Sequence, residues 1–273
     1  MKKLRGFSYV FDYMPMKLLP LPLLVLLFAQ LQATGSDAPQ SFTSGTSRAA
    51  LVELYTSQGC SSCPPAEAFL SKLMSEPELW KRWVPVAFHV DYWDYLGWQD
   101  VFATAANTEM QRQHAERNSG RVYTPAFFIN GEEWRGFFQG QELPVASRDQ
   151  TGILRVETGA DQAVKVTYRD AEAGKRYVAH VALLGFGIDV PIQAGENRGR
   201  TLEHDFTALD VSAVAMKGKD GSYHSTLKVS VPETITAERY GLAVWVTEAG
   251  ELEPLQTTGG VLDPEWTAKA GAS

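Results

Sequence analysis

The sequence predicts an α/β domain over residues 51–150, followed by an all-β, sandwich-like domain over residues 151–265. In the first part, short apolar runs of strand length alternate with stretches that have helical spacing of apolar residues. In the second part, short runs alternate apolar and polar residues and are separated by turns that contain Gly and Asp, which is typical of sheets with one buried face.

The first 33 residues are expected to form a signal peptide rather than part of the fold. Basic residues precede the apolar run Leu18–Ala29, which is too short to span a bilayer because a span needs about 20 residues. Cleavage after Ala33 would leave no membrane anchor, and residues 34–50, rich in Ser, Thr and Gly, would form a flexible lead. We therefore expect an exported protein, either periplasmic or secreted.

Composition limits the classes of partner. The chain has 273 residues and a formal charge of −7, which argues against nucleic acid and anionic membrane surfaces, because both are bound by basic patches. A hydrophobic content of 44% supplies ample material for a core.

The only two cysteines of the chain are Cys60 and Cys63. They follow a strand-like run and precede a helix that Pro64 opens, so they lie at a helix N-terminus, where a thiolate is stabilised. Such a position lowers a cysteine pKa from about 8.5 to roughly 3.5–7.5. A disulfide over so short a loop constrains the unfolded chain little, which favours redox chemistry over an inert structural bond.

The first domain is expected to contain, in order, a strand over Leu51–Thr56, a helix from Pro64 to Met74, a buried strand over Val84–Val90, a helix from Asp100 to about Asn118, and a hairpin of Ala126–Ile129 with Glu132–Phe138. Asp100 is the expected cap of the second helix. Asn130-Gly131 between the last two runs is a strong hairpin signal.

The second domain is expected to contain strands over Ile153–Glu157, Val164–Arg169, Tyr177–Leu184, Ser225–Val231 and Leu242–Thr247.

A strand, a Cys-x-x-Cys at a helix start and a later Thr124-Pro125 before a hairpin resemble the thioredoxin superfamily over residues 51–140. The resemblance implies that the first domain is a thioredoxin-like α/β domain. It also implies that Pro125 is a cis-proline against the dithiol and that the backbone of Thr124 contacts an extended peptide.

Longer motifs are similar to those of an exported bacterial family catalogued as domain of unknown function 1223. They are the runs Val52–Ala66 (VELYTSQGCSSCPPA), Phe88–Trp98 (FHVDYWDYLGW), Tyr123–Pro125, Gly195–Asn197 and Gly199–Asp205. The resemblance implies a thioredoxin-like domain plus a β-rich domain, and it supplies no reaction.

We expect Cys60 to be the exposed nucleophile of low pKa and Cys63 to be the resolving thiol that closes the disulfide. Because Pro64 disfavours helical φ/ψ in the residue before it, Cys63 is expected at the N-cap with a non-helical backbone.

His89 and Asp91 end the second predicted strand and are candidates for a proton relay to Cys60. Two alternatives to the relay stay open for His89. It could pack inward and bond a backbone carbonyl, or it could join Cys60 and Cys63 in a Cu(I) site. The aromatic run Asp91–Trp98 is either an exposed platform or a lid on a core. The polar run Asn197–Asp205 is either a second site or a lock between domains.

The predicted function is thiol–disulfide exchange on exported proteins, with protein thiols and disulfides as partners and no cofactor. A copper-relay protein and a partner-binding protein without catalysis are the rival classes.

Overall fold

The computed structural model describes residues 39–144, 149–169 and 174–268. The predicted signal peptide lies outside the described residues. The described residues all belong to one compact unit. Within the predicted flexible lead, Ser41–Thr43 form strand β1, which pairs with a later strand near Glu157.

Helices account for few of the residues. They are α1 (Pro64–Ser71), α2 (Ala105–Arg117), α3 (Pro264–Ala268) and the short 3₁₀ helices η2 (Lys72–Ser75), η3 (Asp94–Leu96) and η4 (Gly136–Gln139). Across the three described ranges, none of these helices has the length and apolar character that a membrane span requires.

The strands after β1 are β2 (Ala50–Thr56), β3 (Trp83–His89), β4 (Ala126–Ile129), β5 (Glu132–Trp134), β6 (Ile153–Thr158), β7 (Ala163–Arg169), β8 (Tyr177–Phe186), β9 (Ile188–Pro191), β10 (Thr201–His204), β11 (Thr207–Ala215), β12 (Lys217–Lys219), β13 (Ser222–Lys228), β14 (Arg239–Glu248) and β15 (Pro254–Val261).

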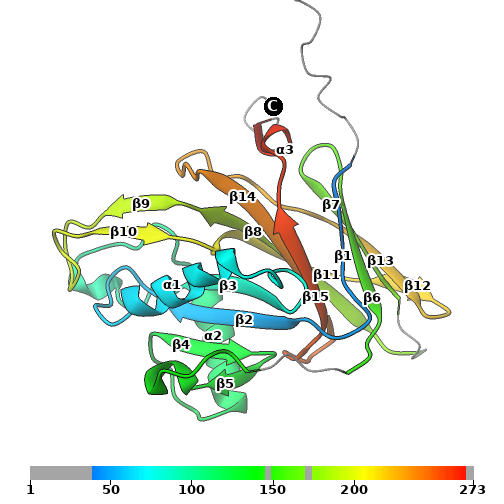
Figure 1. The fold of residues 1–273 in the computed structure, drawn as a ribbon, viewed down its shortest axis with the longest axis horizontal. Coiled ribbons are helices and arrows are strands. Elements are labelled where there is room, and N and C mark those ends of the chain that lie inside the picture. The colour runs from blue at the N-terminus through cyan, green and yellow to red at the C-terminus, as the bar shows by residue number, and fades with distance from the viewer. Residues whose placement is uncertain (1–38, 145–148, 170–173, 269–273) are drawn as a thin grey trace, which may run out of the picture. The chain divides into compact units, whose positions relative to one another are not determined.

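One eight-stranded sheet runs through both predicted domains, in the order β15-β14-β8-β11-β3-β2-β4-β5 (Figure 1). The junction is the parallel pairing of β11 with β3, where Thr207 lies opposite Ala87 and the Ala87 N–H donates to the Phe206 carbonyl at 2.8 Å. Of the described residues, 43% are in strands and 16% in helices. The predicted fold class, a thioredoxin-like α/β domain followed by an all-β domain, is therefore wrong, because one sheet joins the two parts.

A second sheet packs on one end of the first. It has the order β1-β6-β7-β13-β12, and its apolar residues share a core with those of β8 and β14 (Figure 1). Leu154, Val166 and Tyr168 pack there against Val181 and Val244. The inward residues of β6 and β7 alternate with exposed ones, as the sequence pattern predicted.

At the other end of the eight-stranded sheet, α1 and α2 cover opposite faces. Thr56 of β2 bonds Glu67 on α1, whereas its neighbour Tyr55 contacts His114 on α2. Successive residues of a strand point to opposite faces, so the two helices are separated by the sheet.

Local turn and capping chemistry accounts for several element boundaries. Asn130 and Gly131 have φ of 52° and 84°, which gives the hairpin between β4 and β5 a turn with two left-handed residues, as predicted. The second helix begins later than predicted, because Thr104 rather than Asp100 is its cap and accepts from the N–H of Asn107. The strand predicted over Glu132–Phe138 ends at Trp134.

The shared sheet predicts that residues 39–150 do not fold alone. Without residues 151–268, β3 loses its partner β11. The hydrophobic core around β2, β3 and α1 also loses Leu184, Phe206 and Trp245. We expect this fragment to show no cooperative transition in urea when tryptophan fluorescence is followed, whereas residues 39–268 unfold cooperatively. A cooperative transition of the fragment would contradict this account.

Candidate functional site

The dithiol loop connects β2 to α1. Cys63 is the N-cap of α1, as predicted, but its φ of −77° and ψ of −40° are helical, so the predicted non-helical backbone is wrong. The N–H groups of Ala66 and Glu67 both donate to the Cys63 carbonyl, which holds this helical turn in spite of Pro64. Both cysteines are thiols in the structure.

The two thiols differ in pKa. The pKa of Cys60 is lowered to about 6, chiefly because the Cys63 thiol hydrogen-bonds its sulfur, with further help from Ser62 and Thr124 against the effect of burial. The pKa of Cys63 is raised, first by burial and then by its bond to Cys60 and the charge of that neighbour. The Cys60 sulfur lies 3.2 Å from the Ser62 hydroxyl. This asymmetry makes Cys60 the better nucleophile.

The peptide bond between Thr124 and Pro125 is cis, as predicted. The Thr124 carbonyl oxygen accepts from the Cys60 thiol at 3.8 Å, so this segment does lie against the dithiol. The Thr124 hydroxyl accepts from the Trp93 indole N–H at 2.7 Å, which fixes the segment from the other side. Trp93 stacks on Tyr95, a side chain that is 78% exposed. The aromatic run thus supports the site and also presents one ring to solvent.

The connection between β9 and β10 packs on the backbone of the dithiol loop, and we call this connection the cover. The Asn197 side-chain amide donates to the carbonyls of both Gln58 and Cys60, at 2.9 Å each. The neighbouring Glu196 carboxylate accepts from the Ser61 N–H at 2.8 Å. Cys60 is only 1% exposed, so the prediction of an exposed nucleophile is wrong. The polar run Asn197–Asp205 therefore lies partly on the dithiol loop.

His89 and Asp91 do not reach the dithiol by any hydrogen bond in the described ranges. His89 Nδ1 lies 2.8 Å from Asp100, and its ring packs edge-to-face on Phe102 and His204. Asp91 accepts from the Thr108 hydroxyl at 2.6 Å, which ties the end of β3 to α2. Neither residue is placed as a proton relay to Cys60.

A buried polar network lies on the inner side of α1. Glu67 accepts from the Thr56 hydroxyl and pairs with His204 Nδ1, at 2.6 Å each. Burial alone would raise the pKa of Glu67, but His204 and His89 hold it below its ordinary value. Burial alone would lower the pKa of His89, but the carboxylates of Asp100 and Glu67 hold it above its ordinary value.

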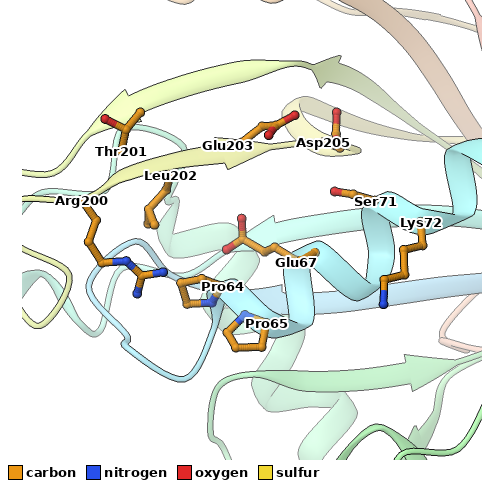
Figure 2. Close-up of a pocket in the computed structure, with 11 residues that line it drawn as sticks. Pro64, Pro65, Glu67, Ser71, Lys72, Arg200, Thr201, Leu202, Glu203 and Asp205 are labelled. Carbon is orange, nitrogen blue, oxygen red and sulfur yellow. The ribbon is translucent and has the colours of Figure 1, made fainter.

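One group of three metal-ligating side chains occurs within the described ranges, namely Glu67, His89 and His204. The Cu(I) set considered from sequence, Cys60 and Cys63 with His89, is not gathered, because His89 turns toward this group. A groove of about 590 Å³ between α1 and β10 has one member of this group, Glu67, among its lining residues. Figure 2 shows Glu67 pointing from α1 toward β10.

Sequence reasoning gave no site role to Gln58 or Glu67, and it took Asp100 for a helix cap. It offered the run that contains Asn197 and His204 as a second site or a lock between domains, without a link to the dithiol. Two weak signals existed. Glu67 follows Cys63 by four residues, about one helical turn, and so shares its face of the helix. The motif Gly195–Asn197 also stood out, but nothing local placed it on the dithiol loop.

Fold and site together define a β-rich protein with a buried dithiol at a helix N-terminus, next to a cis-proline and under a polar cover. The chain matches the family described as "Protein of unknown function (DUF1223)" over residues 51–247 and belongs to that family. No curated protein matches the chain at a significant level.

Two solved structures are similar in fold. One is a crystal structure of a protein from Agrobacterium tumefaciens, 24% identical, with a TM-score of 0.53 over 78% of this chain and 93% of that one. The other is HBP35 of Porphyromonas gingivalis, 14% identical, with a TM-score of 0.57 over 81% of this chain and 77% of that one. At these identities the likeness concerns the fold alone.

The hydrogen bond from the Cys63 thiol to the Cys60 sulfur predicts how Cys60 titrates. Thiolate absorbance at 240 nm should rise with a midpoint near pH 6 in the reduced protein. In Cys63→Ala the midpoint should move toward about 8.5, because the stabilising donor is lost. Cys60→Ser should show no transition below pH 8. A wild-type midpoint above pH 8 would contradict the assignment of Cys60 as the low-pKa thiol.

The cover predicts a second result. Asn197→Ala leaves the Gln58 and Cys60 carbonyls without their buried donor, a loss of about 1–3 kcal/mol. The cover should then open more often, and alkylation of Cys60 by iodoacetamide at pH 8 should accelerate roughly tenfold or more. Asn118→Ala is the matched control, because Asn118 likewise bonds two carbonyls, those of His114 and Gly131, away from the dithiol. Equal alkylation rates in both variants would show that Asn197 does not limit access to Cys60.

Proposed function

We propose that this protein is an exported thiol–disulfide oxidoreductase that acts on protein thiols and disulfides. The observation that carries the proposal is the paired thiols, a Cys60 of low pKa hydrogen-bonded by a Cys63 of raised pKa at the start of α1. A helix N-terminus favours the thiolate form through its unpaired N–H groups and its dipole. An inert structural disulfide requires no such difference between its two sulfurs.

The exchange follows from this asymmetry. The Cys60 thiolate attacks one sulfur of a substrate disulfide, the substrate S–S bond breaks, and the other substrate sulfur leaves as a thiolate that takes a proton from water. Cys63, as a thiolate, then attacks the Cys60 sulfur of the mixed disulfide and releases the second substrate thiol. Two electrons pass to the substrate and Cys60–Cys63 becomes a disulfide. A thiol reductant returns it to the dithiol, and an oxidant drives the reverse direction.

The surroundings of Cys60 support contact with a protein substrate. Thr124 places its carbonyl against the sulfur, and we propose that this segment contacts the substrate chain, as in the thioredoxin superfamily. The relation to that superfamily is proposed for this local arrangement only. Tyr95 is exposed next to Trp93, which holds Thr124, and so offers an apolar contact beside the thiol. Asn197 bonds the backbone carbonyl of Cys60, and we propose that this contact opens when a substrate disulfide approaches.

A trapping experiment tests the proposal. Cys63→Ala should accumulate a mixed disulfide between Cys60 and a reducible protein such as insulin, because no resolving thiol is present. Cys60→Ser should form none, and the wild-type protein should reduce insulin in the presence of dithiothreitol. Both products are measured by non-reducing electrophoresis and mass spectrometry. The proposal fails if Cys63→Ala forms no more mixed disulfide than Cys60→Ser.

A further inference from the structure

The proposed exchange makes no use of the three ligand-bearing side chains on the inner side of α1. Glu67 on α1, His89 at the end of β3 and His204 at the end of β10 each place one ligand atom within 4.8 Å of the other two. His89 and His204 are fully buried and Glu67 is 6% exposed. The three residues come from distant parts of the chain, so the fold itself gathers them.

His89 carries the most informative atom of this group. Its Nε2 has no hydrogen-bond partner although the side chain is fully buried, whereas nearly all buried polar atoms of proteins have one. The other ring nitrogen, Nδ1, is bonded to Asp100. The unpartnered nitrogen therefore belongs to a residue whose ring is fixed by Asp100, and one ligand atom of this residue lies within 4.8 Å of ligand atoms of Glu67 and His204.

Asp100 determines which ring nitrogen of His89 holds the proton. This buried carboxylate also accepts from the backbone N–H groups of Gln58 and Phe102, at 2.8 and 3.0 Å. It therefore accepts the Nδ1–H of His89, which leaves a lone pair on Nε2 when the ring is neutral. Histidine ligands of metals are commonly oriented in this way, by a carboxylate on the second ring nitrogen.

We propose that Glu67, His89 and His204 bind one divalent transition-metal ion, with zinc as the representative. Two imidazoles and one carboxylate form a set that zinc accepts as three protein ligands with a fourth position left for water or another molecule. Magnesium and calcium prefer sets made only of oxygen atoms and do not suit two imidazoles. The groove between α1 and β10 is lined by Glu67, so one of the three ligands borders a space that is open to solvent (Figure 2).

The hydrogen bonds of His204 show what changes when the ion binds. The Trp98 indole N–H donates to Gln58 Oε1 at 2.9 Å, so the Gln58 amide nitrogen faces His204 Nε2 at 3.2 Å. Nδ1 therefore carries the ring proton and donates it to Glu67. Coordination through Nδ1 requires that nitrogen to lose its proton and Nε2 to gain one. Gln58 then turns its carbonyl to Nε2, and the bond from Trp98 breaks.

Zinc binding is tested in the Cys60→Ser/Cys63→Ser double variant, which excludes the thiols as ligands. After treatment with EDTA, the protein is titrated with ZnCl₂ by calorimetry. We expect one ion per chain and a change in tryptophan fluorescence as Trp98 loses its acceptor. In this background, Asp100→Asn should weaken binding about 10–100-fold, as loss of a supporting hydrogen bond does, and His89→Gln should weaken it more.

His114→Gln is the matched control. His114 is also buried, pairs with Glu53 at 3.2 Å and has an unpartnered ring nitrogen, but it is outside the group of three ligands, so binding should not change. If His89→Gln does not fold, the absorption spectrum of the double variant with bound Co²⁺ serves as the test instead. It should show d–d absorption bands of a protein-bound Co²⁺ ion, and the absence of these bands would overturn the proposal. Zinc binding that is absent from the double variant, or equal in His89→Gln and His114→Gln, overturns the proposal.

Discussion

The parallel contact between β3 and β11 is the constraint on which the candidate site depends. It joins the strands that carry the dithiol to those of the C-terminal half, where β10 lies beside α1. Asn197 can bond the Cys60 carbonyl only because of this placement. The same contact brings His204 against Glu67. Without it, the dithiol loop would have neither its cover nor its buried polar neighbours.

The chemistry of the dithiol results from two opposing effects. Hydrogen bonds from Cys63, Ser62 and Thr124 stabilise the Cys60 thiolate, while burial opposes any charge at Cys63. Access is a separate requirement, since Cys60 is only 1% exposed and the connection between β9 and β10 packs on the backbone of its loop. Reactivity and access are thus controlled by different parts of the chain, the first by residues near the cysteines and the second by the connection between β9 and β10.

Local features were predictable from sequence because their causes are local. Pro64 beside the cysteines gave the helix start, and Asn130-Gly131 gave the hairpin turn. The single sheet was not predictable, because the β3–β11 junction joins residues about 120 positions apart through backbone hydrogen bonds that leave no pattern in either strand. For the same reason the low pKa of Cys60 was predicted from its place beside the helix, but its burial was not, since the segment that packs on its loop is distant in sequence.

The measurement that tests the central claim most directly is the reduction potential of the Cys60–Cys63 couple, obtained by equilibrating the protein with glutathione buffers. A working exchange dithiol should have a potential between about −270 and −120 mV, and stabilisation of the Cys60 thiolate favours the less negative part of that range. A potential well below about −300 mV would mean a disulfide that stays closed, and it would contradict thiol–disulfide exchange as the function of this site.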